Sequence, residues 1–244
     1  MRVIAIIPAR LNSKRFPRKL MEKINGIPLI VMTYQNLLSM KIFDEIIVAT
    51  DSQEISNIIK NKGGQVFISK KEHFCGSDRV SEASNNFKSD IVINVQGDEP
   101  FVKPRSIKKI IDFFRDKQNK NIPVVSLIYE TNDPEIINDE NCVKVVTDNN
   151  NFAMYFSRSK IPFPRNIDKN FSFYIHVGVY GFLSQSISHF SNLKPSKLEK
   201  IEMLECIRFI ENGQKIKMIC IDTPTIGIDT PNDLLEAKKY LESI

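Results

Sequence analysis

Short apolar runs rich in β-branched residues recur along the first hundred residues and alternate with segments whose apolar positions have helical spacing. Runs of this kind are typical of strands buried on both faces of a parallel sheet. The predicted strands span residues 3–7, 45–50, 66–69 and 91–95. Predicted helices begin at Pro28, at Asp51 or Ser52, and at Ser77 or Asp78. The alternation predicts an α/β fold, with a mostly parallel twisted sheet and helices on both faces.

The pattern changes after residue 122, where strand signals follow one another without intervening helices. Strands are predicted over 123–129, 142–147, 152–157 and 174–182, and the polar stretch 147–151 is typical of a hairpin. We interpret residues 122–185 as an antiparallel excursion inside a single domain that spans residues 1–244. A helix over 198–210, a strand over 215–221 and a final helix from Thr230 complete the predicted elements.

Composition narrows the class of protein. With 42% hydrophobic and 26% charged residues the chain is an ordinary globular protein and not a disordered one. No apolar run reaches the roughly 18 residues of a membrane-spanning helix, so we expect no membrane association. Four cysteines without a C-x-x-C pair indicate reduced thiols in the cytoplasm. The net charge of +5 is concentrated in one loop, without the basic stripe of a nucleic-acid-binding protein.

That basic loop, residues 8–19, directly follows the first predicted strand. Ligands of open α/β sheets bind outside the carboxyl ends of the strands, and cations with backbone N–H groups can hold phosphates there. The loop contains neither the P-loop motif nor the dinucleotide-binding glycine motif. Its pattern fits either a phosphate-binding loop or a solvated surface loop.

Three acidic residues lie at positions where a metal ligand is one possible interpretation. Asp98 and Glu99 follow the strand 91–95, and a carboxylate at a strand end can hold Mg²⁺ together with substrate phosphates. A turn acid that accepts nearby N–H groups explains the same position. Asp229 precedes the last helix, where the pattern favours an N-terminal cap formed by Asp229 or Thr230 over a second metal ligand.

Further polar positions lie in the second half of the chain. Period-two alternation places Tyr174, His176, Gly178 and Tyr180 on one strand face, which is polar and has room at the glycine. This face fits a binding role or a structural hydrogen bond of His176. Glu199 and Glu202 share a helix face, where pairing with Lys200 or solvent is the simpler interpretation.

Taken together, the segments resemble the 3-deoxy-manno-octulosonate (Kdo) cytidylyltransferase family of lipopolysaccharide synthesis. The matching segments follow the family's order along nearly the whole chain: IIPARLNSKRFPRK, EIIVATDSQEI, HFCGSDRV, VINVQGDEP, NCVKVVTD, AMYFSRSKIPF, HVGVYGF, LEKIEMLECIRFIENGQKI and GIDTPNDL. Three features depart from the family pattern. Arg18-Lys19-Leu20 stands for Gly-Lys-Pro, Cys75-Gly76-Ser77 stands for Ser-Gly-Thr, and the segment between Pro164 and His176 is short.

The resemblance implies the fold of nucleotide-diphospho-sugar transferases and the transfer of CMP from CTP to the anomeric hydroxyl of Kdo, with release of pyrophosphate. It assigns catalytic roles to Lys19, Asp98 and Asp229, of which the two aspartates hold Mg²⁺. It assigns nucleotide binding to Arg10, Ser13, Arg15, Lys19, Gly76, Ser77 and Arg79. It assigns sugar binding to Gln96, Arg158, His176, Tyr180, Glu199 and Glu202. It also implies a homodimer built on the antiparallel excursion.

Two alternatives stay open at this point. One is the same reaction on a related acidic sugar such as 8-amino-Kdo, since one sugar substituent separates the two substrates. The other is a nucleotide-binding module without catalytic activity. The joint presence of Lys19, Asp98 and Asp229 disfavours the module, because mere binding does not require a pair of metal carboxylates.

Overall fold

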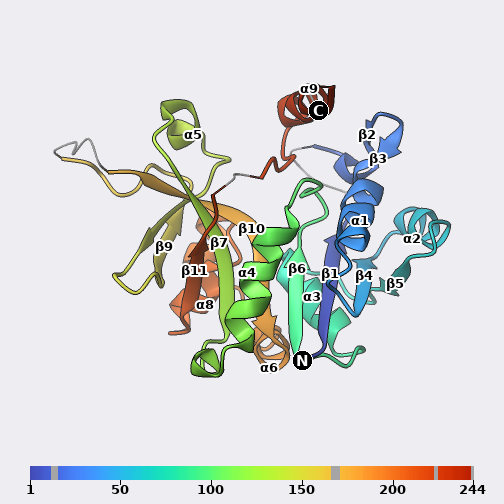
Figure 1. Cartoon of the computed structure of the whole chain (residues 1–244), viewed down its shortest axis with the longest axis horizontal. Helices are drawn as coiled ribbons and strands as arrows, with labels where there is room; N and C mark the ends of the chain where they lie inside the picture. Colours follow the sequence, from blue (N-terminus) through green and yellow to red (C-terminus); the bar gives the residue numbers. More distant parts are fainter. Residues whose placement is uncertain (12–15, 166–170, 223–224, 243–244) are drawn as a thin grey trace.

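The computed structural model describes residues 1–11, 16–165, 171–222 and 225–242. Within these residues nine strands form one mixed sheet with the order β11-β7-β10-β6-β1-β4-β5, to which β8 and β9 are attached through β10 (Figure 1). The strands are β1 Val3–Ala9, β4 Glu45–Thr50, β5 Gln65–Ile68, β6 Ile91–Val95, β7 Val124–Thr131, β8 Lys144–Thr147, β9 Ala153–Ser157, β10 Phe173–Leu183 and β11 Ile216–Cys220. Two short strands, β2 Lys23–Ile24 and β3 Ile27–Pro28, form a separate hairpin. The predicted α/β class is confirmed.

Most strands of the sheet are parallel. β1 pairs in parallel with β4 and β6, β4 with β5, and β7 with β11. β10 is the exception, because it lies antiparallel between β6 and β7. The predicted antiparallel segment is therefore partly built into the main sheet, and the β8–β9 hairpin extends from it. The role of this segment in sugar binding and dimerisation stays a prediction.

Helices cover both faces of the sheet because the strand residues alternate in direction. Val3, Ala5 and Ile7 of β1 belong to one apolar cluster, whereas Ile4 and Ile6 belong to the other. The first cluster includes residues of α1, α2, α4 and α9, and the second includes residues of α3, α6 and α8. The helices are α1 Leu29–Met40, α2 Gln53–Lys60, α3 Gly76–Ser84, α4 Pro104–Arg115, α5 Pro134–Asn138, α6 Ser184–Phe190, α7 Lys197–Glu202, α8 Ile207–Glu211 and α9 Pro231–Glu242, with 3₁₀ turns η1 Lys19–Met21 and η2 Lys117–Asn119. None of the described helices combines the length and apolarity that crossing a membrane requires.

The prediction of one helix over residues 198–210 is wrong. Helix α7 ends at Glu202, Met203 adopts a left-handed conformation with φ 54°, and α8 begins at Ile207. A straight helix would separate residues 199 and 208 by about 13 Å along its axis. The break instead lets Glu199 and Arg208 form an ion pair of 2.6 Å. Apolar periodicity alone could not reveal this break, because both helices continue the same pattern.

Gly181 of β10 provides a test of the packing between the sheet and α4. It pairs with Ile93 of β6 and Val125 of β7, and a Cβ atom there would lie 2.8 Å from Phe114 and closer still to Ile110. We expect Gly181→Ala to lower the free energy of unfolding by about 1–3 kcal/mol, because extra volume in a packed core causes strain. Urea denaturation measures this loss.

A second substitution tests the cause. Ile110→Ala removes the atom nearest to the new methyl group, so Gly181→Ala with Ile110→Ala should be less destabilised than the sum of the single variants. Additive losses, or an unaffected Gly181→Ala protein, would contradict the packing described here.

Candidate active site

Lys19, Asp98 and Asp229 meet at the carboxyl edge of the sheet, although they come from three distant segments. The Lys19 ammonium donates to Asp98 Oδ2 and, at 2.9 Å, to Asp229 Oδ1. Burial alone would lower the pKa of Lys19, but the two carboxylates outweigh it and raise the pKa. The lysine is nearly buried, whereas Asp98 and Asp229 are 26% and 38% exposed. The cluster therefore presents two accessible carboxylates around one buried cation.

Thr230 and Asp233 cap the last helix: Asp233 N–H donates to Thr230 Oγ1 at 3.2 Å, and Thr230 N–H donates to Asp233 Oδ2 at 2.7 Å. Ile228 N–H also donates to the carbonyl of Asp98 at 3.0 Å, which fixes the segment before α9 beside the turn after β6. Of the two caps considered from sequence, Thr230 is confirmed.

Asp98 and Glu99 are neighbours in sequence but occupy different surroundings. Glu99 is only 8% exposed, and its Oε2 has no hydrogen-bond partner among the described residues. Burial, and then the adjacent Asp98, raise the pKa of Glu99 to about 8. The protonated form of this carboxyl is therefore favoured at pH 7, and Asp98 is the residue of the two that is suited to a cation.

A cleft of about 610 Å³ lies where β1 and β4 end. It is lined by Arg10, Leu11, Asp51, Ser52, Gln53, Glu54, Glu72, His73 and Arg79, so it contains two of the predicted nucleotide-binding residues. The Arg79 guanidinium donates hydrogen bonds to Asp51 at 2.7 Å and to the carbonyl of Ala9 at 3.3 Å. Burial would raise the pKa of Asp51, but the Arg79 guanidinium outweighs it and lowers that pKa. Ser13 and Arg15 lie outside the described residues.

The first turn of α3 joins the predicted nucleotide and sugar residues. Cys75 is its N-cap, and Ser77 donates to Glu205 from its N–H at 2.9 Å and from its hydroxyl at 2.7 Å. Gln96 approaches the same carboxylate at 3.5 Å and packs against Gly76, where a Cβ atom would lie 3.0 Å from Gln96 Oε1. Glu205 was not among the candidates from sequence. Its spacing of three residues from Glu202 was the available signal.

Arg158 and Glu202 form a second polar group beside this turn. Ser157 Oγ and Arg158 N–H donate to the Glu202 carboxylate at 2.7 and 3.0 Å. The Arg158 guanidinium donates to the main-chain carbonyls of Glu202 and Glu140 at 2.8 and 2.9 Å. Glu202 therefore positions Arg158, whose own guanidinium contacts main-chain oxygens.

His176 and Tyr180 share a face of β10, as the alternation predicted, but Tyr180 is buried and His176 is half-buried. His176 Nε2 lies 2.8 Å from Ser126 Oγ, and its ring lies 5.2 Å from the rings of Phe156 and Tyr180. Burial lowers the pKa of His176 to about 3, so the imidazole is neutral at physiological pH. Tyr180 is 5% exposed and belongs to the apolar cluster that includes residues of α3, α6 and α8.

Glu199 lies apart from these groups. It is fully buried, and both of its carboxylate oxygens accept hydrogen bonds from Arg208. The structure thus brings Gln96 together with the first turn of α3 and Arg158 together with Glu202, but it commits Glu199 to Arg208.

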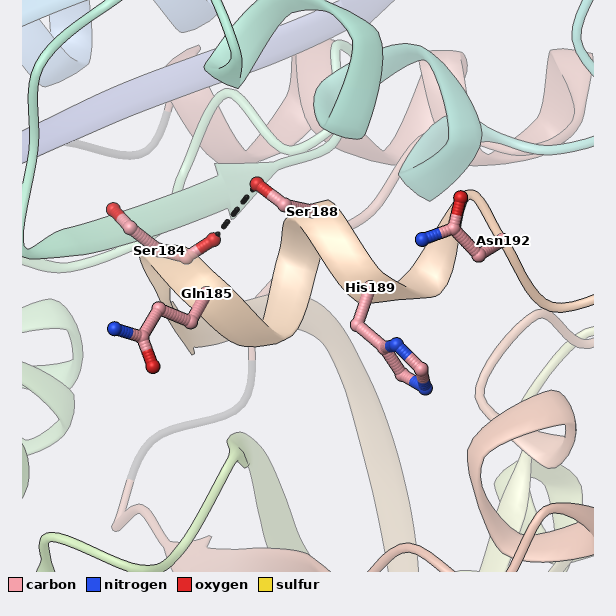
Figure 2. A pocket seen from close by; sticks show the side chains of 5 residues that line it. All are labelled: Ser184, Gln185, Ser188, His189 and Asn192. Atoms are coloured by element: carbon pink, nitrogen blue, oxygen red, sulfur yellow. Dashed lines mark hydrogen bonds between the residues drawn. The ribbon is translucent and has the colours of Figure 1, made fainter.

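A second hollow, of about 480 Å³, lies on the surface of α6 (Figure 2). Its lining is Ser184, Gln185, Ser188, His189 and Asn192, and Figure 2 shows these side chains along one helix and the turn after it. Ser184 N–H donates to the carbonyl of Asp90, just before β6 begins. This hollow is therefore at the opposite edge of the sheet from Lys19 and is not part of the candidate active site.

Comparison with known proteins defines the class. The family model for cytidylyltransferases matches residues 4–216, which is most of the chain. An open α/β sheet with cations and carboxylates gathered at its strand ends is the architecture that such nucleotide chemistry requires. The protein is a nucleotidyltransferase of the cytidylyltransferase class.

Individual relatives narrow the class further. The chain is 45% identical over 240 residues to the 3-deoxy-manno-octulosonate cytidylyltransferase of Christiangramia forsetii, covering 98% of this chain and 97% of that one. It is 43% identical to that of Flavobacterium johnsoniae, with both chains fully covered. A CMP:2-keto-3-deoxy-manno-octonic acid synthetase complexed with CTP has a TM-score of 0.90 and 32% identity, with 100% and 99% of the two chains covered. The chain therefore belongs to the 3-deoxy-manno-octulosonate cytidylyltransferase family, which confirms the resemblance drawn from its sequence.

The half-buried His176 generates a prediction about pH and stability. Its folded-state pKa of about 3 lies below the ordinary value of 6.5, so the unfolded chain takes up the proton more readily. Its contribution to stability is therefore complete above about pH 6.5 and is lost as the pH falls toward 3. We expect the free energy of unfolding of His176→Gln to fall less than that of the wild type between pH 7 and pH 4, as measured by urea denaturation.

The exposed His189 provides the matched control, because it lies on the surface of α6, among the residues that line the hollow on that helix (Figure 2). His189→Gln should keep the wild-type dependence of stability on pH. If His176→Gln kept it too, the neutral imidazole described here would be wrong.

Proposed function

We propose that the protein transfers CMP from CTP to the anomeric hydroxyl of Kdo and releases pyrophosphate. The relatives are named for this reaction, and the similar solved structure is a complex with CTP. The observation that carries the proposal is the convergence of Lys19, Asp98 and Asp229 at the same edge of the sheet as the cleft that contains Arg10 and Arg79. This reaction needs cations that bind the phosphates of CTP and carboxylates that hold a metal ion.

In the proposed reaction the anomeric oxygen of the sugar attacks the α-phosphorus of CTP. The bond from that phosphorus to the oxygen of the β-phosphate breaks, pyrophosphate leaves, and the hydroxyl proton passes to solvent. Lys19 and Arg10 neutralise charge on the phosphate oxygens, together with the predicted Ser13 and Arg15 of the same loop. No side chain forms a covalent intermediate, so catalysis consists of positioning and charge stabilisation.

Mg²⁺ is the proposed cofactor, and Asp98 and Asp229 would hold it. Both carboxylates contact one ammonium group, so both can reach one small cation. The described residues contain no group of three or more acidic, histidine or cysteine side chains around a common point. This donor set fits Mg²⁺, which commonly takes one or two carboxylates and completes its shell with water and substrate phosphates. When bound, the metal would polarise the phosphoryl oxygens and steady the leaving group.

We assign the sugar side to Gln96, Arg158 and His176. Arg158 offers a planar fork suited to the sugar carboxylate, and Glu202 holds it in place. The neutral imidazole of His176 can form a hydrogen bond with a hydroxyl group of the sugar. Glu205 joins Gln96 to Ser77, so it links the sugar side to the nucleotide side. We do not assign Glu199 to sugar binding. Tyr180 packs against the ring of His176 and so supports its position.

We also propose that the protein is a homodimer that assembles through the segment around β8 and β9. Met154, Ile201 and Met203 are 60%, 67% and 63% exposed, and they flank the contact between Ser157 and Glu202. Exposed apolar side chains gathered in one region are typical of an interface.

The proposed location is the cytoplasm. The four cysteines are free thiols, as expected in a reducing compartment.

Pyrophosphate release from the purified protein tests the reaction. With CTP, Mg²⁺ and Kdo we expect turnover, and kcat/KM for CTP should exceed that for ATP by about tenfold or more, or ~1.4 kcal/mol. Replacement of Kdo by 8-amino-Kdo identifies the preferred sugar. Comparable kcat/KM for ATP would contradict cytidine recognition. CTP binding without pyrophosphate release from either sugar would indicate a nucleotide-binding module instead.

Asp229→Asn tests the metal assignment. We expect turnover to fall by roughly two orders of magnitude, because the loss of one carboxylate removes several kcal/mol of metal-dependent stabilisation. The melting temperature should change little, since Thr230 and Asp233 cap α9. Steady-state kinetics across a Mg²⁺ titration measures the loss.

The adjacent Thr230 provides a control in which stability, and not turnover, is expected to change. Thr230→Ala removes the helix cap and should lower the free energy of unfolding by about 1 kcal/mol, with turnover retained. Near-normal turnover by Asp229→Asn at low Mg²⁺ would remove Asp229 from the proposed metal site.

A further inference from the structure

Arg208 is a buried cation whose hydrogen-bonding capacity is fully used. Its side chain is 1% exposed, and its Nε and Nη2 donate to the two oxygens of Glu199 at 2.8 and 2.6 Å. Nη1 and Nη2 donate to the two oxygens of Asp78 at 2.7 and 3.2 Å, and Nη1 also reaches the carbonyl of Leu193 at 3.3 Å. The guanidinium lies 4.2 Å above the ring of Phe190. Its orientation is thus fixed from several sides.

The two carboxylates that it holds occupy equivalent positions in two different helices. Asp78 is the third residue of α3, where it accepts from the N–H of Cys75 and completes a capping box. Glu199 is the third residue of α7, where it does the same for Ser196. One guanidinium therefore fixes the first turns of two helices relative to each other, although they are more than a hundred residues apart in sequence.

Each of these helices carries part of the proposed active site. The first turn of α3 presents Gly76 and Ser77, and Arg79 follows one residue after Asp78. Helix α7 ends at Glu202, which holds Arg158. Between α7 and Arg208 lies Glu205, which accepts two hydrogen bonds from Ser77. The nucleotide side and the sugar side are thus connected through a short path that passes through Arg208.

Stability alone is a weak explanation for such a group. Removing two carboxylates and a guanidinium from water is costly, and buried ion pairs can often be replaced by uncharged residues without loss of stability. A planar fork that engages two carboxylates in one plane instead provides a fixed geometry that a flexible ammonium cannot reproduce.

We propose that Arg208 is a positioning residue that fixes the nucleotide-binding turn of α3 relative to the sugar-binding end of α7. It contacts neither substrate and acts through Asp78 and Glu199. The proposal rests on the proposed function for the identity of the two sides. Its consequence is that loosening Arg208 weakens the binding of both substrates.

Two variants test this role. Arg208→Lys keeps the charge and loses the fork. A triple variant, Arg208→Met with Asp78→Asn and Glu199→Gln, removes all three charges together, and its amide oxygens can still cap α3 and α7. Because no unpaired charge stays buried, this variant keeps the test valid even if Arg208→Lys does not fold. Arg115→Gln is the control, since Arg115 is 53% exposed and makes only a 3.7 Å ion pair with Asp112 on the same helix.

The readouts are the Kd of CTP by calorimetry, and KM and kcat from pyrophosphate release, with folding checked by circular dichroism. For folded Arg208→Lys and for the triple variant we expect the Kd of CTP and the KM of the sugar to rise by about tenfold or more, because small misplacements of binding groups have effects of this size. Arg115→Gln should behave like the wild type.

A purely structural role gives a different result. It would reduce the fraction of active protein and hence the apparent kcat, but leave the Kd of CTP and the KM of the sugar unchanged, and this result would overturn the proposal. Failure of the proposed function is seen separately, since the wild type would then release no pyrophosphate, while the effect of Arg208 on CTP binding could still be measured.

Discussion

The contact of one buried ammonium with two carboxylates is the interaction on which the candidate active site depends. Asp98 and Asp229 lie close enough to share Lys19, and without a cation between them their charges would repel each other. The sheet supplies the geometry. β1 and β6 are parallel neighbours, so the loop after β1 and the turn after β6 emerge at the same edge. In the proposed reaction, Asp98 and Asp229 would hold Mg²⁺, and Lys19 lies at the same carboxylates with its ammonium group available to a phosphate of CTP.

The antiparallel strand β10 brings the sugar side to this same edge. Val179 of β10 pairs with Val95, the last residue of β6, so residues 173–178 extend past the end of β6. Gly178 therefore lies against Gln96 and Glu99, and a Cβ atom there would be 3.5 Å from each of these side chains. A parallel strand in this place would have begun at the far edge of the sheet. This reversed strand thus joins the two halves of the proposed site.

The sequence predicted β1, β4, β6 and β7 well because they are buried over most of their length, where a continuous apolar run leaves little ambiguity. The position of Asp98 at the edge of the sheet followed from the same pattern, since the end of such a strand is easily located. Asp229 was ambiguous, because an acid before a helix has the pattern of a cap whether or not it caps. The hydrogen bonds of Thr230 and Asp233 identify a cap of this helix that the sequence pattern could not single out.

The three acids Glu199, Glu202 and Glu205 show where prediction from sequence ended. They recur every three residues, yet each is held by a partner from elsewhere: Arg208, Ser157 and Ser77, respectively. Periodicity placed Glu199 and Glu202 on one face of a continuous helix. The left-handed Met203 ends that helix and directs the acids to different places. The identity of a long-range partner leaves no local signal, so these roles required the structure.

Long-range contacts of this kind can give two adjacent residues different exposure and different pKa values. Asp98 is partly exposed and bound to a cation, whereas Glu99 is enclosed beside Gly227 and Gly178 and has a raised pKa. A side chain at Gly227 would press on the Glu99 carboxyl, since its Cβ would lie 3.1 Å from Oε1. An uncharged Glu99 can therefore pack against the segment that leads to Asp229 without adding a third negative charge to the cluster. The pair of acids after β6 thus divides two tasks that one residue could not perform: Asp98 contributes charge at the edge of the sheet, and Glu99 supports the segment that delivers the second charge.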